Sequence, residues 1–432
     1  MNVRFGTDGV RGRVGGEVHA ELALALGNAL AVELGARGVE GPVAVAMDTR
    51  PSGPMLEAAV VAGICAAGAR AVRCGVIPTA GLSHVVAAHG WGAGVMITAS
   101  HNPAHDNGLK VVDARGRKAD PALREALERR MAVARVHDDV PGDVVVWDEA
   151  GDEWVDAVRR RVPRGAWLSG TRIVLDAANG AARGHAARLL GHLGAEVIAI
   201  GEGSGAAIND ACGAVHPGAL AAEVRRTGAD AGIALDGDAD RVVLCDSQGA
   251  ILDGDAILWL LAGGGTVVGT VMSNDGLARG LAARGVSLVR SAVGDSHVAA
   301  AMEAHGAALG AEPSGHVLFA DGLPTGCGML AALRALAPDA RGLRSRLEGY
   351  RPTRQVHATV PRGGVAGGQA PPPQAEDPRL REAMGALEAR GCRIVVRPSG
   401  TEPVTRIMVE HEDEGVARAG LDTLRAILGG TR

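Results

Sequence analysis

The segment AGIALDGDADRVVLCD, residues 231–246, decides the fold class of this chain. An apolar run with strand character (231–235) leads into a polar Gly/Asp loop and then into a second apolar run (242–245). The same order, an apolar strand before a Gly/Ser/Asp loop, recurs in GVMITASHN (94–102) and AALGAEPSGHVLF (307–319), and Ala/Leu-rich helical stretches lie between such segments. This alternation predicts an α/β architecture with largely parallel strands.

The length of 432 residues suggests two to four domains, at about 100–200 residues per domain. The last part of the chain has an order of its own: strand 355–360, helix 379–390, strands 392–397 and 404–411, and helix 414–428. The Pro/Gly-rich segment 361–378 reads as a loop or linker. Because ligands in open α/β sheets bind beyond the carboxyl ends of the strands, we expect a central cleft. We predict three similar α/β domains with mixed sheets and a smaller α+β C-terminal domain around it, at 1–150, 151–248, 249–352 and 353–432.

Composition and charge exclude several classes of function. The net charge of −5 gives the chain no general attraction to nucleic acid, and eight aromatic residues are too few for a base-stacking platform. No apolar run is long enough to span a membrane, and the N-terminal residues lack a signal segment. The six cysteines form no CxxC pair. We therefore expect a cytoplasmic protein with reduced thiols and no nucleic-acid or membrane partner.

The loop LDGDADR places Asp236, Asp238 and Asp240 at every second position after an apolar run. In extended backbone this spacing puts the three carboxylates on one side. Hard oxygen donors without His or Cys favour Mg²⁺, one ion per site, completed by a phosphate oxygen. An EF-hand is excluded because Arg241 and Ser247 stand where its glycine and glutamate belong. A solvated acidic turn is the alternative, but three uncompensated carboxylates repel one another.

Ser100 follows the apolar run VMIT and is flanked by His101 and Asn102. A hydrolase nucleophile would need a G-x-S-x-G elbow, which is absent, and adjacent Ser and His are poorly placed as nucleophile and base. A serine that carries a phosphoryl group fits better, because its phosphate would complete the Mg²⁺ shell. A plain polar turn remains an alternative for this motif.

Three further motifs complete a phosphoryl-transfer set. Arg397 and Arg406 flank a polar turn and offer bidentate guanidinium donors for a phosphate. The turn residues able to cradle that dianion are Ser399, Gly400 and Thr401. In EPSGH, Glu312 and Ser314 could read sugar hydroxyls and His316 could transfer a proton or be structural. Arg11 lies in a Gly-flanked loop, and the only lysines are Lys110, a candidate base, and Lys118, expected to be a solvated surface residue.

With these motifs in family order, the chain resembles the α-D-phosphohexomutase superfamily, in its bacterial phosphoglucosamine mutase branch. The motifs are FGTDGVRG, DTRPSG, TASHNPAHDNGLK, DAANGAA, INDACGAVHP, LDGDADR, VGDSHV, AEPSGH and RPSGTEP. The resemblance implies that Ser100 is the phosphorylated serine, that the three aspartates bind Mg²⁺, and that Arg11 and Lys110 lie near the reacting phosphate. It also implies that Glu312, Ser314 and His316 bind the sugar, and that the loop from Arg397 to Arg406 binds the second phosphate.

The activity implied is the interconversion of glucosamine 6-phosphate and glucosamine 1-phosphate through a phosphoserine and a 1,6-bisphosphate, which also serves as activator. Such an activity supplies UDP-N-acetylglucosamine for cell-wall precursors. On this reading Arg241, beside the metal loop, is a weaker candidate for charge neutralisation, and the chain is a monomer or a homodimer. The chain departs from the family pattern at Pro313, where glutamine is frequent, and at Cys327, in TGCG rather than TGDG, both in or near the region that reads the sugar. The alternatives are a phosphomannomutase/phosphoglucomutase, a metallophosphatase and a non-catalytic sugar-phosphate-binding protein.

Overall fold

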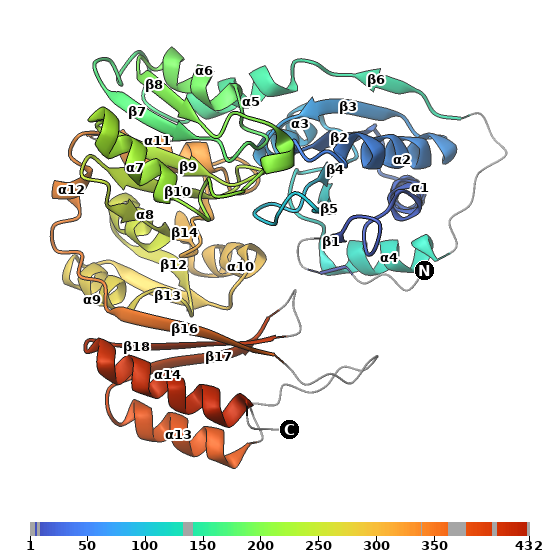
Figure 1. Ribbon diagram of the computed structural model, residues 1–432. Helices are drawn as coiled ribbons and strands as arrows, with labels where there is room; N and C mark the ends of the chain where they lie inside the picture. The colour runs from blue at the N-terminus through green and yellow to red at the C-terminus, as the bar shows by residue number, and fades with distance from the viewer. Residues whose placement is uncertain are drawn as a thin grey trace.

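The computed structural model describes residues 5–6, 9–132, 141–337, 339–361, 377–399 and 404–429. Four units follow one another in an arc (Figure 1): the first in blue to cyan, the second in green, the third in yellow, and the fourth in orange to red. Each unit has its own sheet. Three α/β units and a smaller C-terminal α+β unit are as predicted.

The first unit has a six-stranded sheet of order β1-β5-β4-β2-β3-β6. Its elements are β1 (Val10–Arg13), α1 (Ala20–Ala36), β2 (Val43–Met47), α2 (Gly53–Ala66), β3 (Ala71–Val76), α3 (Thr79–His89), β4 (Ala93–Ile97), β5 (Asp106–Asp113), α4 (Pro121–Met131) and β6 (Val144–Val146). The strands β2, β3, β4 and β6 are parallel, whereas β5 runs antiparallel to both β1 and β4. The sheet is therefore mixed, because β4 and β5 are joined by a short loop instead of a crossover helix.

The second unit has the sheet order β11-β10-β9-β7-β8, and the third β13-β12-β14-β15. The second contains α5 (Ala150–Arg159), β7 (Arg172–Asp176), α6 (His185–His192), β8 (Glu196–Ile200), η1 (Gly205–Ala207), α7 (Gly218–Thr227), β9 (Ala231–Leu235), β10 (Val242–Asp246) and β11 (Ile251–Leu252). The third contains α8 (Gly254–Leu261), β12 (Thr266–Thr270), α9 (Asp275–Ala283), β13 (Ser287–Ser291), α10 (Asp295–His305), β14 (Leu309–Ala311), β15 (Val317–Phe319), α11 (Gly328–Leu336) and α12 (Leu343–Arg346). In both sheets the parallel strands occupy one side, out to the edge strands β8 and β13, and antiparallel strands complete the other side. The sheets are therefore mixed, as predicted, and only partly parallel.

One buried apolar cluster runs through the second and third units together. It includes Leu235 and Leu244 of the second sheet and Leu330 and Leu333 of α11, all fully or almost fully buried. The first and fourth units also have apolar clusters of their own. Because burial of apolar area is the main stabilising term in folding, the second and third units form one packed body.

The fourth unit consists of β16 (Arg354–Pro361), α13 (Pro378–Glu388), β17 (Arg393–Pro398), β18 (Val404–His411) and α14 (Glu414–Gly429), with the sheet order β16-β18-β17. These bounds agree with the sequence prediction within two residues. Both helices cover the sheet face that points away from the third unit (Figure 1). On the other face the ion pair between Arg393 and Glu410 contacts the third unit, because Arg393 donates to the carbonyl of Val271 (2.6 Å) and Glu410 accepts from the Asp275 amide (2.6 Å).

Candidate active site

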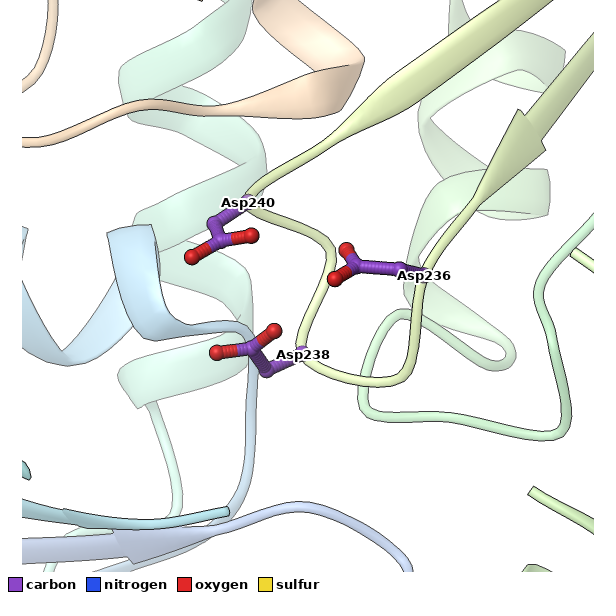
Figure 2. Close-up of side chains that lie close together, drawn as sticks. All are labelled: Asp236, Asp238 and Asp240. Carbon is purple, nitrogen blue, oxygen red and sulfur yellow. The ribbon is translucent and has the colours of Figure 1, made fainter. Parts of the chain in front are cut away.

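The three aspartates lie in the loop between β9 and β10, which is a tight turn. The Ala239 amide donates to the Asp236 carbonyl (2.9 Å), and Ala239 has a φ of +57°. One carboxylate oxygen of each aspartate lies within 4.8 Å of the others, and Figure 2 shows the three side chains converging on one space. The expectation that extended backbone aligns Asp236, Asp238 and Asp240 is therefore wrong, because the turn brings them together.

Burial and mutual repulsion shift the acidity of this cluster. Burial raises the pKa of Asp236 to about 8, and the charges of Asp240 and Asp238 add to that rise. Burial would also raise the pKa of Asp240, but Lys110, His316 and Arg241 outweigh it and hold that pKa well below its usual range. Without a cation, the crowding of three buried carboxylates therefore disfavours full ionisation of the cluster.

The donor set of the cluster fits a magnesium ion. Within the described residues, the Oδ1 atoms of Asp238 and Asp240 are buried and accept no hydrogen bond. Buried carboxylate oxygens without a donor are costly unless a cation or a proton compensates them. All available ligands are hard oxygens, which suit Mg²⁺ and suit zinc or copper poorly.

Ser100 lies in the loop between β4 and β5, with a φ of +52° that is uncommon for a residue other than glycine. Its hydroxyl donates to Asp236 Oδ2 (2.6 Å), so a phosphate on this serine would lie beside the carboxylates. Its amide donates to Thr98 Oγ1 (2.8 Å). Its carbonyl accepts from Arg50 Nη2 (3.0 Å) and, across the domain boundary, from Asn209 Nδ2 (2.8 Å). The serine is thus held in a strained conformation from two domains.

The neighbouring His101 is poorly suited as a base for Ser100. Its Nδ1 lies 3.5 Å from Ser100 Oγ, beyond the usual reach of a nucleophile–base pair. Burial lowers the pKa of His101 to about 4, and the charges of Arg241 and Arg11 lower it further. The geometry therefore disfavours a serine hydrolase.

Lys110 is buried on β5 and reaches the aspartate cluster from the first unit. Its Nζ donates to Asp238 Oδ2 (2.6 Å) and lies 3.6 Å from Asp240 Oδ2. Arg11 is on the neighbouring strand β1, where it pairs with Gly108. Lys110 of the first unit thus contacts the loop of the second, whereas the charge of Arg11 acts on His101, the neighbour of Ser100.

The hairpin of β14 and β15 brings the third unit to the same loop. His316 is buried, with Nδ1 3.8 Å from Asp240 Oδ1. Burial would lower the pKa of His316, but Asp240 and then Asp295 outweigh it and raise that pKa. Glu312 accepts from the Gly294 amide (2.8 Å), and Ser314 is exposed at the turn. Glu312, Ser314 and His316 therefore lie on one turn, from which His316 reaches the aspartates.

Arg241 joins the second unit to the third. Its amide donates to Asp236 Oδ1 (3.1 Å), its Nε lies 3.9 Å from Asp240 Oδ1, and its backbone pairs with that of His316. Burial would lower the pKa of Arg241, but Asp240 and Asp236 outweigh it and raise that pKa. The arginine therefore compensates the charge of the acidic cluster.

The two departures from the family pattern lie in different surroundings. Cys327 is buried in the apolar cluster of the second and third units, and Gly328 beside it donates to the Ala239 carbonyl (3.0 Å). Pro313 is half-buried on the turn with Glu312 and accepts from the Gly254 amide (3.1 Å). Cys327 is thus a packing position, whereas Pro313 belongs to the turn itself.

Arg397 and Arg406 lie opposite each other on β17 and β18. They line a cavity of about 340 Å³ together with Met272 of the third unit and His357 of β16. Burial lowers the pKa of Arg397, and the charge of Arg406 lowers it further. Two neighbouring guanidinium groups repel each other, so an anion between them would be stabilising. Of the turn residues, Ser399 donates its amide to the Val404 carbonyl (2.9 Å), whereas Gly400 and Thr401 lie outside the described residues.

Sequence reasoning missed several contacts of the site. Thr79 donates to Asp238 Oδ2 (2.6 Å) and carried no signal in the sequence. Arg50 and Asn209 stand in the motifs DTRPSG and INDACGAVHP, which marked the family but gave these residues no role. The prediction that Lys118 is a solvated surface residue is wrong, because its side chain is only 19% exposed and its Nζ lies 2.5 Å from Asp295 Oδ2.

Comparison with known proteins identifies the same family as the sequence motifs. Phosphoglucomutase/phosphomannomutase models match four segments: alpha/beta/alpha domain I at residues 2–136, domain II at 152–249, domain III at 251–348, and the C-terminal domain at 364–426. A phosphoglucosamine mutase of Xanthomonas campestris pv. campestris is 42% identical, with 97% of each chain covered.

Solved structures share the fold. A phosphoglucomutase/phosphomannomutase family protein of Burkholderia thailandensis superposes with a TM-score of 0.80 at 26% identity, covering 100% of this chain and 98% of that one. An N-acetylphosphoglucosamine mutase of Aspergillus fumigatus, solved with GlcNAc-6P and magnesium, superposes with a TM-score of 0.66 at 17% identity, covering 99% and 96%. The chain therefore belongs to the phosphoglucomutase/phosphomannomutase family of the α-D-phosphohexomutase superfamily, where it groups with the phosphoglucosamine mutases.

Proposed function

We propose that this phosphohexomutase interconverts glucosamine 6-phosphate and glucosamine 1-phosphate through a phosphorylated Ser100 and glucosamine 1,6-bisphosphate. One observation carries the proposal: Ser100 Oγ lies 2.6 Å from one carboxylate of a buried, convergent three-aspartate cluster. Lys110 Nζ lies 2.6 Å from the next carboxylate. Relatives named phosphoglucosamine mutase at 42% identity support the amino sugar as substrate.

The cluster of Asp236, Asp238 and Asp240 would hold one Mg²⁺. When bound, the ion would neutralise part of the charge on the phosphoryl group of Ser100 and polarise its oxygens. The magnesium in the Aspergillus fumigatus enzyme is consistent with this assignment.

The residues of this chain then position and neutralise the reacting groups. The phosphorus–oxygen bond at Ser100 breaks as a bond forms to the free sugar hydroxyl, whose proton passes to a nearby base. Lys110 is our first assignment for that base and His316 the second, since both side chains reach the aspartate cluster. Each accepts the proton only in its neutral form, so Lys110 must first give up the proton with which it bonds Asp238. Arg11 supplies positive charge from β1. The intermediate is then reoriented and returns its other phosphate to Ser100.

Binding of the sugar and its distal phosphate falls to the third and fourth units. Glu312 and Ser314 would read sugar hydroxyls, and Arg397 and Arg406 would hold the phosphate that is not reacting. The charge of Glu312 acts on Arg397, which supports a shared role of the sugar loop and the clamp. Ser399, Gly400 and Thr401 complete the proposed clamp.

Parallel initial rates test the substrate. Glucosamine 6-phosphate, glucose 6-phosphate and mannose 6-phosphate are compared with Mg²⁺ and the matching 1,6-bisphosphate. We expect glucosamine 6-phosphate to react more than about a hundredfold faster, roughly 2.7 kcal/mol of transition-state discrimination. Comparable rates on glucose or mannose would assign the chain to the phosphomannomutase/phosphoglucomutase class instead.

Intact-mass measurement tests the phosphoserine, with Ser100→Ala as the matched control. We expect a phosphate adduct on the wild-type chain that the variant lacks. Release of free phosphate without isomerisation would indicate a metallophosphatase. Binding without turnover of any sugar phosphate would indicate a sugar-phosphate-binding protein.

A further inference from the structure

The first and third units are joined by an ion pair that the mechanism does not use. Lys118 Nζ lies 2.5 Å from Asp295 Oδ2, and the two side chains are 19% and 10% exposed. One residue follows β5 in the first unit, and the other begins α10 in the third. The pair thus connects the unit that carries Ser100 to the unit that carries His316.

Backbone contacts fix both members of the pair. Lys118 pairs with Val112, and the Ala119 amide donates to the Val111 carbonyl (2.9 Å), so Lys118 is tied to the same strand as Lys110. Both lysines line one small cavity beside β5. Asp295 is the first residue of α10, and its Oδ1 accepts from the Ser296 amide (2.7 Å), which leaves Oδ2 for Lys118.

The same Asp295 oxygen faces His316. It lies 3.7 Å from His316 Nε2, while Nδ1 on the opposite side of the ring lies 3.8 Å from Asp240 Oδ1. Within the described residues, His316 Nε2 is buried and neither accepts nor donates a hydrogen bond. The imidazole therefore stands between a carboxylate of the aspartate cluster and a carboxylate that Lys118 holds in place.

The scarcity of lysine in this chain supports a specific role for Lys118. The chain has 44 basic residues, of which only Lys110 and Lys118 are lysines, and both approach carboxylates of the site. An ammonium is a compact point charge on a flexible stem, whereas a guanidinium is a planar fork. A compact charge can pair with one carboxylate oxygen without covering the imidazole beside it.

We propose that Lys118 and Asp295 are positioning residues for His316. Lys118 holds the Asp295 carboxylate in the position from which it orients the imidazole, and the ion pair also fixes the third unit against the first at the reacting centre. This inference rests on the proposed function, because it concerns the same site. Neither residue needs to touch the substrate for this role. Its expected signature is a loss of turnover at nearly unchanged substrate binding.

The test compares steady-state kinetics of Lys118→Met, Asp295→Asn, the double variant and Lys118→Arg with the wild-type chain, using the hexose phosphate that the wild type turns over fastest. We expect each neutral variant to lose kcat about tenfold or more with KM within about threefold. The double variant should be no worse than the poorer single variant, because the two side chains act as one unit. Lys118→Arg, which keeps the charge but places it on a planar fork, should recover only part of the loss.

Arg341→Met is the matched control. Arg341 pairs with Asp230 at 3.2 Å and also joins two units, but its side chain is 60% exposed. Its kinetics should stay within about twofold of the wild type. Thermal melting of every variant shows whether the fold is retained.

Several results would overturn the inference. These are kcat within twofold of wild type in Lys118→Met or Asp295→Asn, losses that multiply in the double variant, or a rise in KM that accounts for the whole effect. An equal loss in Arg341→Met would reduce the pair to a general interdomain contact. A wild-type chain that favours glucose or mannose phosphate would refute only the proposed substrate, and one without any mutase activity would refute both proposals.

Discussion

Replacement of Arg50 tests whether the serine loop is held in position by a single buried side chain. Arg50 pairs with Asp48 (Nε to Oδ2, 2.9 Å), and both side chains are fully buried. Its Nη2 donates to the carbonyls of Ser100 (3.0 Å) and Asn102 (2.7 Å), and its Nη1 donates to that of Asp106 (2.8 Å). One guanidinium therefore fixes the loop between β4 and β5 along most of its length.

Two magnitudes follow for Arg50→Met. The variant leaves Asp48 as a buried carboxylate without its cation, which costs about 3–5 kcal/mol. For a domain of about 150 residues this lowers the melting temperature by roughly 6–20 °C. The carbonyls of the loop also lose their donor, and a shift of Ser100 by about 1 Å would lower turnover by about a hundredfold.

Arg50→Lys separates the two effects. An ammonium keeps a positive charge for Asp48 but cannot serve several carbonyls in fixed directions as the guanidinium does. We expect melting to recover in part while kcat remains low. Circular dichroism melting and initial rates on the preferred hexose phosphate measure the two quantities.

Arg70→Met supplies the control for this series. Arg70 pairs with Asp143 in the same unit, but the two side chains are 57% and 59% exposed, so the melting temperature should hardly change. The reasoning fails if Arg50→Met melts like Arg70→Met, or if it keeps kcat within threefold of wild type.

Three further variants test other parts of the site and fold. Ser100→Ala should lose nearly all mutase activity and keep its melting temperature, since its hydroxyl donates to Asp236 and adds little to packing; full activity would end the phosphoserine account. Asp238→Asn should raise the Mg²⁺ concentration for half-maximal rate by about tenfold or more and lower turnover, and an unchanged metal titration would contradict the ligand assignment. Asp255→Asn tests a pH dependence: burial, then the charge of Asp253, raises the pKa of Asp255 to about 7. The wild type should therefore lose up to about 4 kcal/mol of stability as pH rises from about 4 through 7, and the variant should melt higher than wild type at pH 8 but not at pH 4.5; equal melting at both would refute the shift.

No helix among the described residues is both long and apolar enough to cross a membrane. Elements of the fourth unit were predicted within two residues, since alternation and helical periodicity are local properties that are read within a short window of the sequence.

Contacts between residues far apart in the sequence could not be predicted from such short segments. The carboxamide of Asn209 reaches the Ser100 carbonyl over 109 residues of chain, and the hydroxyl of Thr79 reaches Asp238 over 159. Nothing within either local segment specifies its partner, because the loops meet only when separate sheets pack. Lys118 was misjudged in the same way, since its neighbour Asp295 belongs to another unit.

The sequence by itself determined the chemical types at the site: hard carboxylate oxygens, a serine hydroxyl, the lysine Lys110, and arginines beside a polar turn. Those types favour phosphoryl transfer at a site that could bind a metal ion. Only the tertiary structure decided which charges face one another, and so why Asp236 and Asp240, four residues apart, have pKa values shifted in opposite directions. The physical reason is that desolvation and Coulomb interactions depend on distance and burial in space, which arise only when the first three units pack around one turn.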